Sequence, residues 1–412
     1  MNTIDLAYRS PLASIGFRWL LVYRICTILS YQIVAVAVGW QVYEITRDPL
    51  SLGLIGLAEV IPFFCVAPFS GYLVDHLPRR QLGAAACAIL AANALALALI
   101  AADWLPVNGL WPIYLAIAVG GVGRSFFGPV YNALFARVLE REQFARGAGM
   151  GSVVFQAGLV LGPALGGVLI GVAGTVATYA LAVGFAVVAA AALLAMSIAD
   201  PMHQVERAPI LASIGEGLRF VFGHQLLLAA LALDMFAVLF GGAISLAPAF
   251  IKDVLHAGPE ALGILRGAPA LGSVAVAIWL SRHPLQANAG RILLVSVAGF
   301  GACMIGFGLS TAFWLSALLL LVSGIFDGVS VVLRSTILQL ATPDEMRGRV
   351  SSVNSIFISS SNELGAFYSG AMARLLGLVP SVVIGGLLTI GVVGVTAVRA
   401  PKLRRLDLRD LH

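Results

Sequence analysis

The sequence carries very little charge for its length. Only 11% of its 412 residues are Asp, Glu, Lys or Arg, whereas soluble domains carry about 25%. Hydrophobic residues make up 60% of the chain, and apolar runs of roughly 20 residues, the length that crosses a bilayer core, recur along it. The composition therefore excludes a soluble protein and predicts an all-α membrane protein.

Cysteine and lysine are also scarce. The four cysteines lie within apolar runs and form no C-x-x-C pair, so neither a disulfide framework nor a zinc site is indicated. The only lysines, Lys252 and Lys402, follow Ile251 and Pro401, so the chain lacks the G-x-x-x-x-G-K-[ST] loop of an ATP-driven pump. It also lacks H-E-x-x-H and G-x-S-x-G. We therefore expect no enzyme activity, no metal and no cofactor.

The basic residues give the chain a net charge of +5, and their placement explains it without nucleic acid. Most of the 25 Lys and Arg residues fall in alternate loops, and only Arg47 and Lys252 fall in the loops between. Membrane proteins keep their basic loops in the cytoplasm. The pattern therefore predicts that both termini are cytoplasmic, which requires an even number of spans.

The apolar runs predict twelve spanning helices in two six-helix bundles. We place the helices at roughly 17–44, 50–75, 82–103, 112–138, 147–171, 175–198, 225–251, 260–281, 291–311, 313–339, 350–376 and 379–399. The predicted domains are a cytoplasmic segment at 1–16, a bundle at 17–198, a cytoplasmic linker at 199–224, a second bundle at 225–399 and a basic cytoplasmic tail at 400–412.

Two short matches relate the bundles to each other. The pattern P-x-x-L-G opens the second span at 49–53 and the eighth at 259–263, and Arg-Gly precedes both the fifth span (146–147) and the eleventh (347–348). Both matches fall at corresponding places when the first six spans are laid on the last six. The halves are therefore predicted to be parallel repeats, a common plan among transporters.

The linker between the bundles has apolar residues four positions apart. These are Ile210, Ile214, Leu218 and Phe222. Residues with this spacing share one helical face, which predicts an amphipathic helix lying at the membrane interface. A disordered loop is the alternative.

The loop after the second span contains Gly71, then Asp75, then the pair Arg79 and Arg80. This order is similar to the signature loop of the major facilitator superfamily. The resemblance implies the major facilitator fold and a cytoplasmic latch made by these four residues. Gly71 would let two helices approach closely. As an alternative, the two arginines could serve only to set the topology.

In the superfamily, the acid of this loop faces the positive N-terminal end of the eleventh helix. That end would include Ser351 and Ser352 here, and breaking the contact would let the halves rock. His76 and Pro78 depart from the usual basic residue and glycine of the signature.

The fifth span carries a glycine pattern that resembles the antiporter motif of exporting branches of the superfamily. Its residues are Gly149, Gly158, Gly162, Pro163, Gly166 and Gly167. Glycines four apart make a smooth stripe for close packing, and a proline bends the helix. The resemblance favours export by antiport, whereas ordinary glycine packing is the alternative.

Ionisable residues inside the predicted spans are candidates for function, because a charge at mid-membrane costs at least about 2.5 kcal/mol. They are Arg24, Glu59, Arg124, Asp234, Arg266, Asp327, Arg334 and Glu363, and Arg124 stands in a motif that resembles the arginine-containing fourth helix of the superfamily. Their alternative role is in structural ion pairs. The repeat carries Arg124 to within two residues of Asp327, which suggests opposite charges across a central cavity.

Carboxylates in such a cavity can load and release protons. The proton-coupling candidates are Asp327, Glu363 and Asp234, in that order. The residues that could add hydrogen bonds to a substrate are Asn362, Asn354, Gln32 and Gln156.

Residues 342–349 and 361–365 resemble the enterobactin-exporter-like branch of the superfamily, the transmembrane secretion effectors. The resemblance implies a secondary transporter that works by alternating access in the bacterial inner membrane as a monomer. Its partners would be lipids, protons and a small organic substrate such as a siderophore, a metabolite or a drug. An importer or uniporter of the same fold, an intramembrane enzyme and a non-transporting scaffold are the alternatives.

Overall fold

The computed structural model describes residues 10–105, 109–197, 210–283, 285, 287–343 and 346–411. Their regular structure is helical. The helices are α2 (Ile15–Thr46), α3 (Pro49–His76), α4 (Arg79–Ala101), α5 (Trp111–Val138), α6 (Phe144–Ala195), α7 (Ile210–Gly223), α8 (Gln225–Gly241), α9 (Ala247–Asp253), α10 (Glu260–Arg282), α11 (Ala289–Leu309), α12 (Phe313–Leu340), α13 (Arg347–Leu376), α14 (Leu378–Arg399) and α15 (Pro401–Arg404). Short 3-10 turns lie at Pro11–Ala13, Arg141–Gln143, Ala243–Leu246 and Leu408–Leu411.

Ten helical segments of the described chain are long and apolar enough to cross a membrane. One of them, Arg146–Ala195, lies within α6, which consists of two helices that meet at Gly174. The 30-residue α13 is not among the ten, because its serine and asparagine residues lower its hydropathy. Counting both arms of α6 and α13 would give twelve crossings, and that number remains a prediction.

Glycine makes two of the sharp junctions between consecutive helices. Gly174, between the arms of α6, has φ 82°, and Gly377, between α13 and α14, has φ 95°. Residues with a Cβ rarely adopt such angles. These junctions coincide with the predicted breaks after 171 and after 376.

The described chain packs as two compact units. Unit 1 contains the described residues of Met1–Val42 and Ala58–Glu206, and unit 2 those of Tyr43–Leu57 and Arg207–His412. The end of α2 and the beginning of α3 thus belong to unit 2, although both helices continue into unit 1. The predicted boundaries at 17–198 and 225–399 remain predictions.

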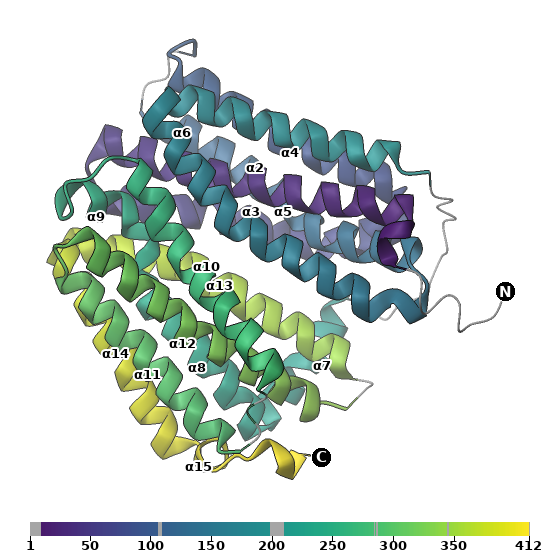
Figure 1. The fold of residues 1–412 in the computed structure, drawn as a ribbon, viewed down its shortest axis with the longest axis vertical. Coiled ribbons are helices and arrows are strands. Elements are labelled where there is room, and N and C mark those ends of the chain that lie inside the picture. The colour runs from purple at the N-terminus through teal and green to yellow at the C-terminus, as the bar shows by residue number, and fades with distance from the viewer. Residues whose placement is uncertain are drawn as a thin grey trace. The chain divides into compact units, whose positions relative to one another are not determined.

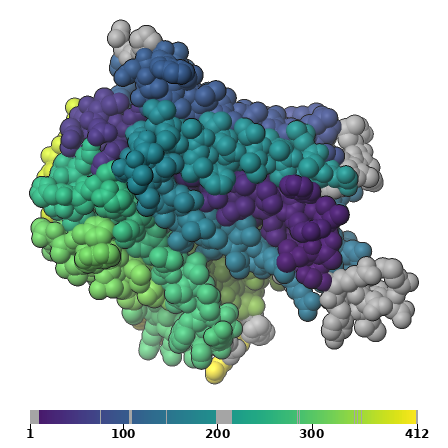
Figure 2. Space-filling view, turned by 45° about the horizontal axis from the view of Figure 1, so that its top comes forward, coloured from purple at the N-terminus to yellow at the C-terminus, as the bar shows by residue number. Residues whose placement is uncertain are grey.

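The helices of each unit pack in the same order, as expected for two repeats. In unit 1, α4 packs against α5 and α6; in unit 2, α11 packs against α12 and α14 (Figure 1). In unit 1, α2 contacts the second arm of α6 where the Ser30 hydroxyl donates to the carbonyl oxygen of Ala182 (2.7 Å), and the two segments are adjacent in Figure 2. The corresponding contact in unit 2 joins α8 to α14.

The helix α7 occupies the predicted amphipathic linker, and the side that it packs against the rest of unit 2 is not the apolar face predicted for the membrane interface. Val221 is fully buried against residues of α8, α12 and α13, and Gly217 lies against the backbone of Arg349. Phe222, expected on the apolar face, is 60% exposed. The helix therefore turns a different side toward unit 2, and the side chains of 210–214 lie outside the described residues.

The segment after α14 also packs onto unit 2. Leu403, Leu406 and Leu408 are buried in the same cluster as residues of α8, α11 and α12. The amide of Gly290, at the start of α11, donates to the carbonyl oxygen of Leu406 (3.2 Å). The predicted basic tail thus contains an apolar side that the unit buries.

Candidate functional site

The intramembrane charges of unit 1 include a partly buried ion pair. Arg124 Nη1 of α5 lies 2.5 Å from Glu59 Oε1 of α3, and the Tyr31 hydroxyl of α2 donates to the same oxygen (2.9 Å). Three helices thus meet at one carboxylate. Gly121 permits this approach, because a Cβ there would lie 2.5 Å from the carbonyl oxygen of Glu59.

A second arginine of unit 1 is stacked on aromatic rings. The guanidinium carbon of Arg24 lies 3.8 Å from the ring centroid of Tyr131 and 5.1 Å from that of Phe155. Such contacts attract a cation to the ring face. Its Nε is buried without a hydrogen-bond partner.

Unit 2 also contains an intramembrane ion pair, between Asp234 of α8 and Arg334 of α12. Their side chains are 9% and 6% exposed, so the pair is more deeply buried than that of unit 1. Asp327, Ser330 and Arg334 follow one another at helical spacing along one face of α12. This face of α12 therefore presents two charged side chains and one hydroxyl group.

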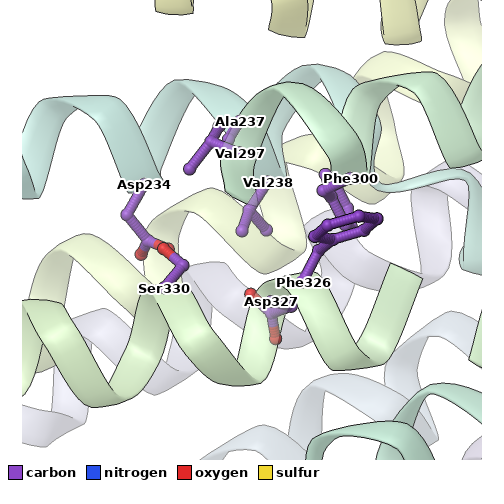
Figure 3. Close-up of a pocket in the computed structure, with 8 residues that line it drawn as sticks. All are labelled: Asp234, Ala237, Val238, Val297, Phe300, Phe326, Asp327 and Ser330. Atoms are coloured by element: carbon purple, nitrogen blue, oxygen red, sulfur yellow. The ribbon is translucent and has the colours of Figure 1, made fainter. Parts of the chain in front are cut away.

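A small cavity lies beside this pair. It is lined by Asp234, Ala237, Val238, Val297, Phe300, Phe326, Asp327 and Ser330, which come from α8, α11 and α12 (Figure 3). Its volume is about 10 Å³, close to the minimum that one water molecule needs. The two carboxylates therefore border a space suited to water or a proton and too small for an organic substrate.

Glu363 and Asn362 do not line this cavity. The Glu363 carboxylate lies against Gly56 at the start of α3, where a Cβ would be 3.2 Å from its Oε2. Asn362 is exposed, and its amide donates to the carbonyl oxygen of Ile358 on its own helix (2.9 Å). Among the three proton-coupling candidates, the structure brings together Asp234 and Asp327.

The predicted signature loop is mostly helical: Gly71 and Asp75 lie in α3, Arg79 and Arg80 begin α4, and residues 77–78 connect the two helices. No described atom would come within 4 Å of a Cβ on Gly71, and its close approach to another helix stays a prediction. Arg79 is buried, and Arg80 donates to the carbonyl oxygens of Leu193 (3.0 Å) and Leu194 at the end of α6. A cation at this end of a helix is stabilising. The side chains of Asp75 and Ser352 lie outside the described residues.

The glycine stripe of α6 packs against α2. A Cβ on Gly158 would lie 2.6 Å from Ile28, one on Gly162 2.5 Å from Gln32, and one on Gly166 3.3 Å from Val36. The contacted residues are four apart on α2. Pro163 and Gly167 are buried beside the stripe, whereas a Cβ on Gly149 would meet no described atom within 4 Å. Gly149 therefore lies outside the packed stripe.

A polar cluster that the sequence analysis missed joins the turn between α2 and α3 to α9 and α13. Its contacts within unit 2 are Tyr43 to Asp253, Glu44 to Lys252 (2.9 Å), Arg47 to Asp253 (3.7 Å) and Asp48 to Arg374 (3.2 Å). We call this set of seven residues the strap. The one sequence feature that pointed to this cluster was that Arg47 and Lys252 were the only basic residues predicted in the non-cytoplasmic loops.

Residues 47–50 determine the local geometry of the strap. Arg47 has φ 52°, which reverses the chain within two residues. The Asp48 carboxylate then accepts from the amide of Leu50 (3.0 Å), and Pro49 occupies the first position of α3. Both features are typical of a helix N-terminus.

Comparison with known proteins identifies the family. The family model described as transmembrane secretion effector matches residues 7–412. The chain belongs to this family of major facilitator transporters. Among the described residues, no group of three or more His, Cys, Asp or Glu side chains could hold a metal ion.

Relatives of this chain are named as exporters. The enterobactin exporter EntS of Citrobacter koseri is 26% identical over 382 residues, covering 90% of this chain and 88% of the relative. The enterobactin exporter EntS of Escherichia coli O81 is 26% identical over 390 residues, covering 92% and 90%. The protein is thus an integral membrane transporter, which removes the enzyme alternative.

Solved structures share the fold. A bacterial homologue of the lysosomal transporter Spinster, inward-facing and unoccupied, has a TM-score of 0.74 at 12% identity, with 96% of this chain and 97% of that one covered. A point mutant of the nucleoside transporter NupG has a TM-score of 0.70 at 12% identity, with 93% and 99% covered. The predicted major facilitator fold is confirmed.

Proposed function

We propose that this transporter exports a small organic molecule in exchange for protons by alternating access. The observation that carries the proton step is the cavity beside Asp234 and Asp327. The likeness to named enterobactin exporters over most of both chains supports export and makes a siderophore or another secreted metabolite the substrate to test first.

The cavity residues suggest how a proton is handled. A proton that enters the cavity binds Asp327. It thereby neutralises one of the two neighbouring carboxylates. When the proton passes to Asp234, the ion pair with Arg334 is weakened, because a neutral carboxyl group attracts a guanidinium less than a carboxylate does. The packing of α8 on α12 therefore depends on whether a proton is bound, which is what coupling requires.

Two contacts serve as gates in this proposal. On the cytoplasmic side, the proposed latch consists of Gly71 and Asp75 near the end of α3 and of Arg79 and Arg80 at the start of α4, and Arg80 anchors it to the end of α6. On the opposite side of the membrane, the strap holds the adjoining ends of α2 and α3 to α9 and α13 of unit 2. Because both helices continue into unit 1, releasing the strap would free them to move with that unit.

The positive-inside pattern supports an orientation with both termini cytoplasmic. In the proposal, the protein works as a monomer in the bacterial inner membrane, with lipids around its apolar surface. Substrate then passes from the cytoplasm outward while protons pass inward.

Flux into inside-out vesicles tests the proposal. With an acidic lumen, we expect siderophores, metabolites or drugs from a screened panel to accumulate, and a protonophore to abolish the accumulation. Asp327→Asn should lose the dependence on the pH gradient, whereas Glu142→Gln, at an exposed acid, should retain it. Flux that ignores the gradient would refute antiport, and gradient-driven movement out of the lumen would indicate an importer.

A further inference from the structure

Arg24 lies well inside the apolar part of α2. It is nine residues from the first residue of the helix, or roughly 14 Å along the axis at 1.5 Å per residue. An isolated cation at such a depth is costly, so intramembrane arginines usually face a partner or a cavity.

The environment of Arg24 repeats that of Arg124, except for the acid. Arg124 lies over the rings of Tyr31 (4.8 Å) and Phe63 (5.4 Å) and has Glu59 as its counter-ion. Arg24 also lies over two rings. However, no described carboxylate is within ion-pair distance of it, and its Nε is buried without a partner.

The two rings determine how a ligand could reach Arg24. Aromatic rings that stack on a guanidinium occupy its faces, which leaves the N–H groups at its edge to donate. That edge matches the two oxygens of a carboxylate or phosphate. Arg24 is partly exposed and Phe155 is 39% exposed, so a ligand can approach the edge and pack against the ring.

We propose that Arg24, held by Tyr131 and Phe155, binds an oxyanion group of the exported molecule, so that the transporter takes anionic organic substrates. The inference rests on the proposed export function. Arg24 supplies the charge, Phe155 contacts the apolar part of the ligand, and Tyr131 positions the guanidinium. The oxyanion of the substrate then acts as the counter-ion of Arg24, as Glu59 does for Arg124.

Binding to the purified full-length protein in a neutral detergent tests the proposal without any transport. The probes are 2-naphthoate and its uncharged analogue 2-naphthamide. We expect Arg24→Met to weaken naphthoate binding by about tenfold to a hundredfold, as for loss of a charged hydrogen bond, and to leave naphthamide binding unchanged. Arg24→Lys should lose less, because it keeps the charge without the planar fork.

Naphthamide binding also reports whether each variant is folded. Equal naphthoate affinity in the wild type and Arg24→Met would overturn the proposal, as would a wild type that binds naphthoate no better than naphthamide. Because no gradient is applied, a failure of proton coupling would leave these results unaffected.

A lipid phosphate has the same oxyanion chemistry, and nanodiscs separate the two sources. If the site serves substrate, phosphatidylglycerol should not weaken naphthoate binding relative to discs of phosphatidylcholine alone. Competition by phosphatidylglycerol that disappears in Arg24→Met would assign the site to a headgroup and overturn the substrate role.

Discussion

The two units contain opposite surpluses of intramembrane charge. Unit 1 has two such arginines, Arg24 and Arg124, for one acid, Glu59. Unit 2 has one more acid than arginine, and its cavity joins two of the acids, Asp234 and Asp327. Since an unbalanced charge in an apolar medium is costly, each surplus indicates a ligand of opposite sign. The difference suggests that unit 1 handles an anion and unit 2 a proton.

The largest expected effect follows from combining the two surpluses. Exporting one monoanion while importing one proton moves two charge equivalents across the membrane, each worth about 2.3 kcal/mol per 100 mV. We therefore expect flux in proteoliposomes to respond to a potassium diffusion potential set with valinomycin, even without a pH gradient. Flux that is insensitive to potential would contradict the assignment of opposite ligands to the units.

The next test compares the ion pairs. Asp234→Ala should destabilise the protein by about 3–5 kcal/mol, because it leaves Arg334 buried and unpaired. Glu59→Ala should cost less, since the Arg124 side chain is 29% exposed and can recruit water. Thermal unfolding in detergent measures both losses. The double variant Asp234→Ala/Arg334→Leu should recover most of the stability, and a loss equal to that of Asp234→Ala would show that charge is not the cause.

The acids of unit 2 can also be compared with each other. Asp327→Asn should reduce pH-driven flux by at least about tenfold, as expected when a proton-transfer group is lost, because Asp327 borders the cavity. Glu363→Gln should have a smaller effect, since Glu363 lies outside it. A pH-sensitive dye in the lumen reports the proton movement. If Glu363→Gln abolished coupling and Asp327→Asn did not, the cavity would not be the proton site.

The glycine stripe of unit 1 offers a structural test with a control on the same helix. Gly162→Ala should destabilise by about 1–3 kcal/mol, the usual cost of overpacking, because its Cβ would meet Gln32 of α2. Gly149→Ala has open space and should be neutral or slightly stabilising. Melting temperatures compare the two. Equal effects would mean that the stripe does not set the contact between α6 and α2.

The sequence predicted the parts of this protein that depend on local pattern. The apolar runs placed the helices, and the breaks at Gly174 and Gly377 coincide with the predicted gaps, because glycine is required there by the backbone itself. The spacing of the glycines also predicted a closely packed stripe, although it did not identify α2 as the helix that packs on it.

Contacts between distant helices were not predictable in the same way. The candidates Glu59, Arg124, Asp234 and Arg334 were recognised one by one as charges in apolar runs, but which acid meets which arginine depends on helix rotation and depth. The repeat suggested Arg124 and Asp327 on opposite sides of a cavity, which stays a prediction, but it gave no hint that Arg124 pairs with Glu59.

The smallest expected effect concerns the strap, in which the side chains of Arg47 and Asp253 are 59% and 45% exposed. Asp253 bonds Tyr43 and lies 3.7 Å from Arg47, and exposed ion pairs contribute only about 0.2–1 kcal/mol. A double-mutant cycle between Asp253→Asn and Arg47→Gln should give a coupling energy in that range, and a cycle of Asp253→Asn with Glu44→Gln should give none. Because the strap holds the ends of helices that continue into unit 1, Asp253→Asn should change the transport rate more than the stability. A variant with wild-type turnover and a measurable coupling energy would make the strap a structural contact of unit 2 rather than a gate.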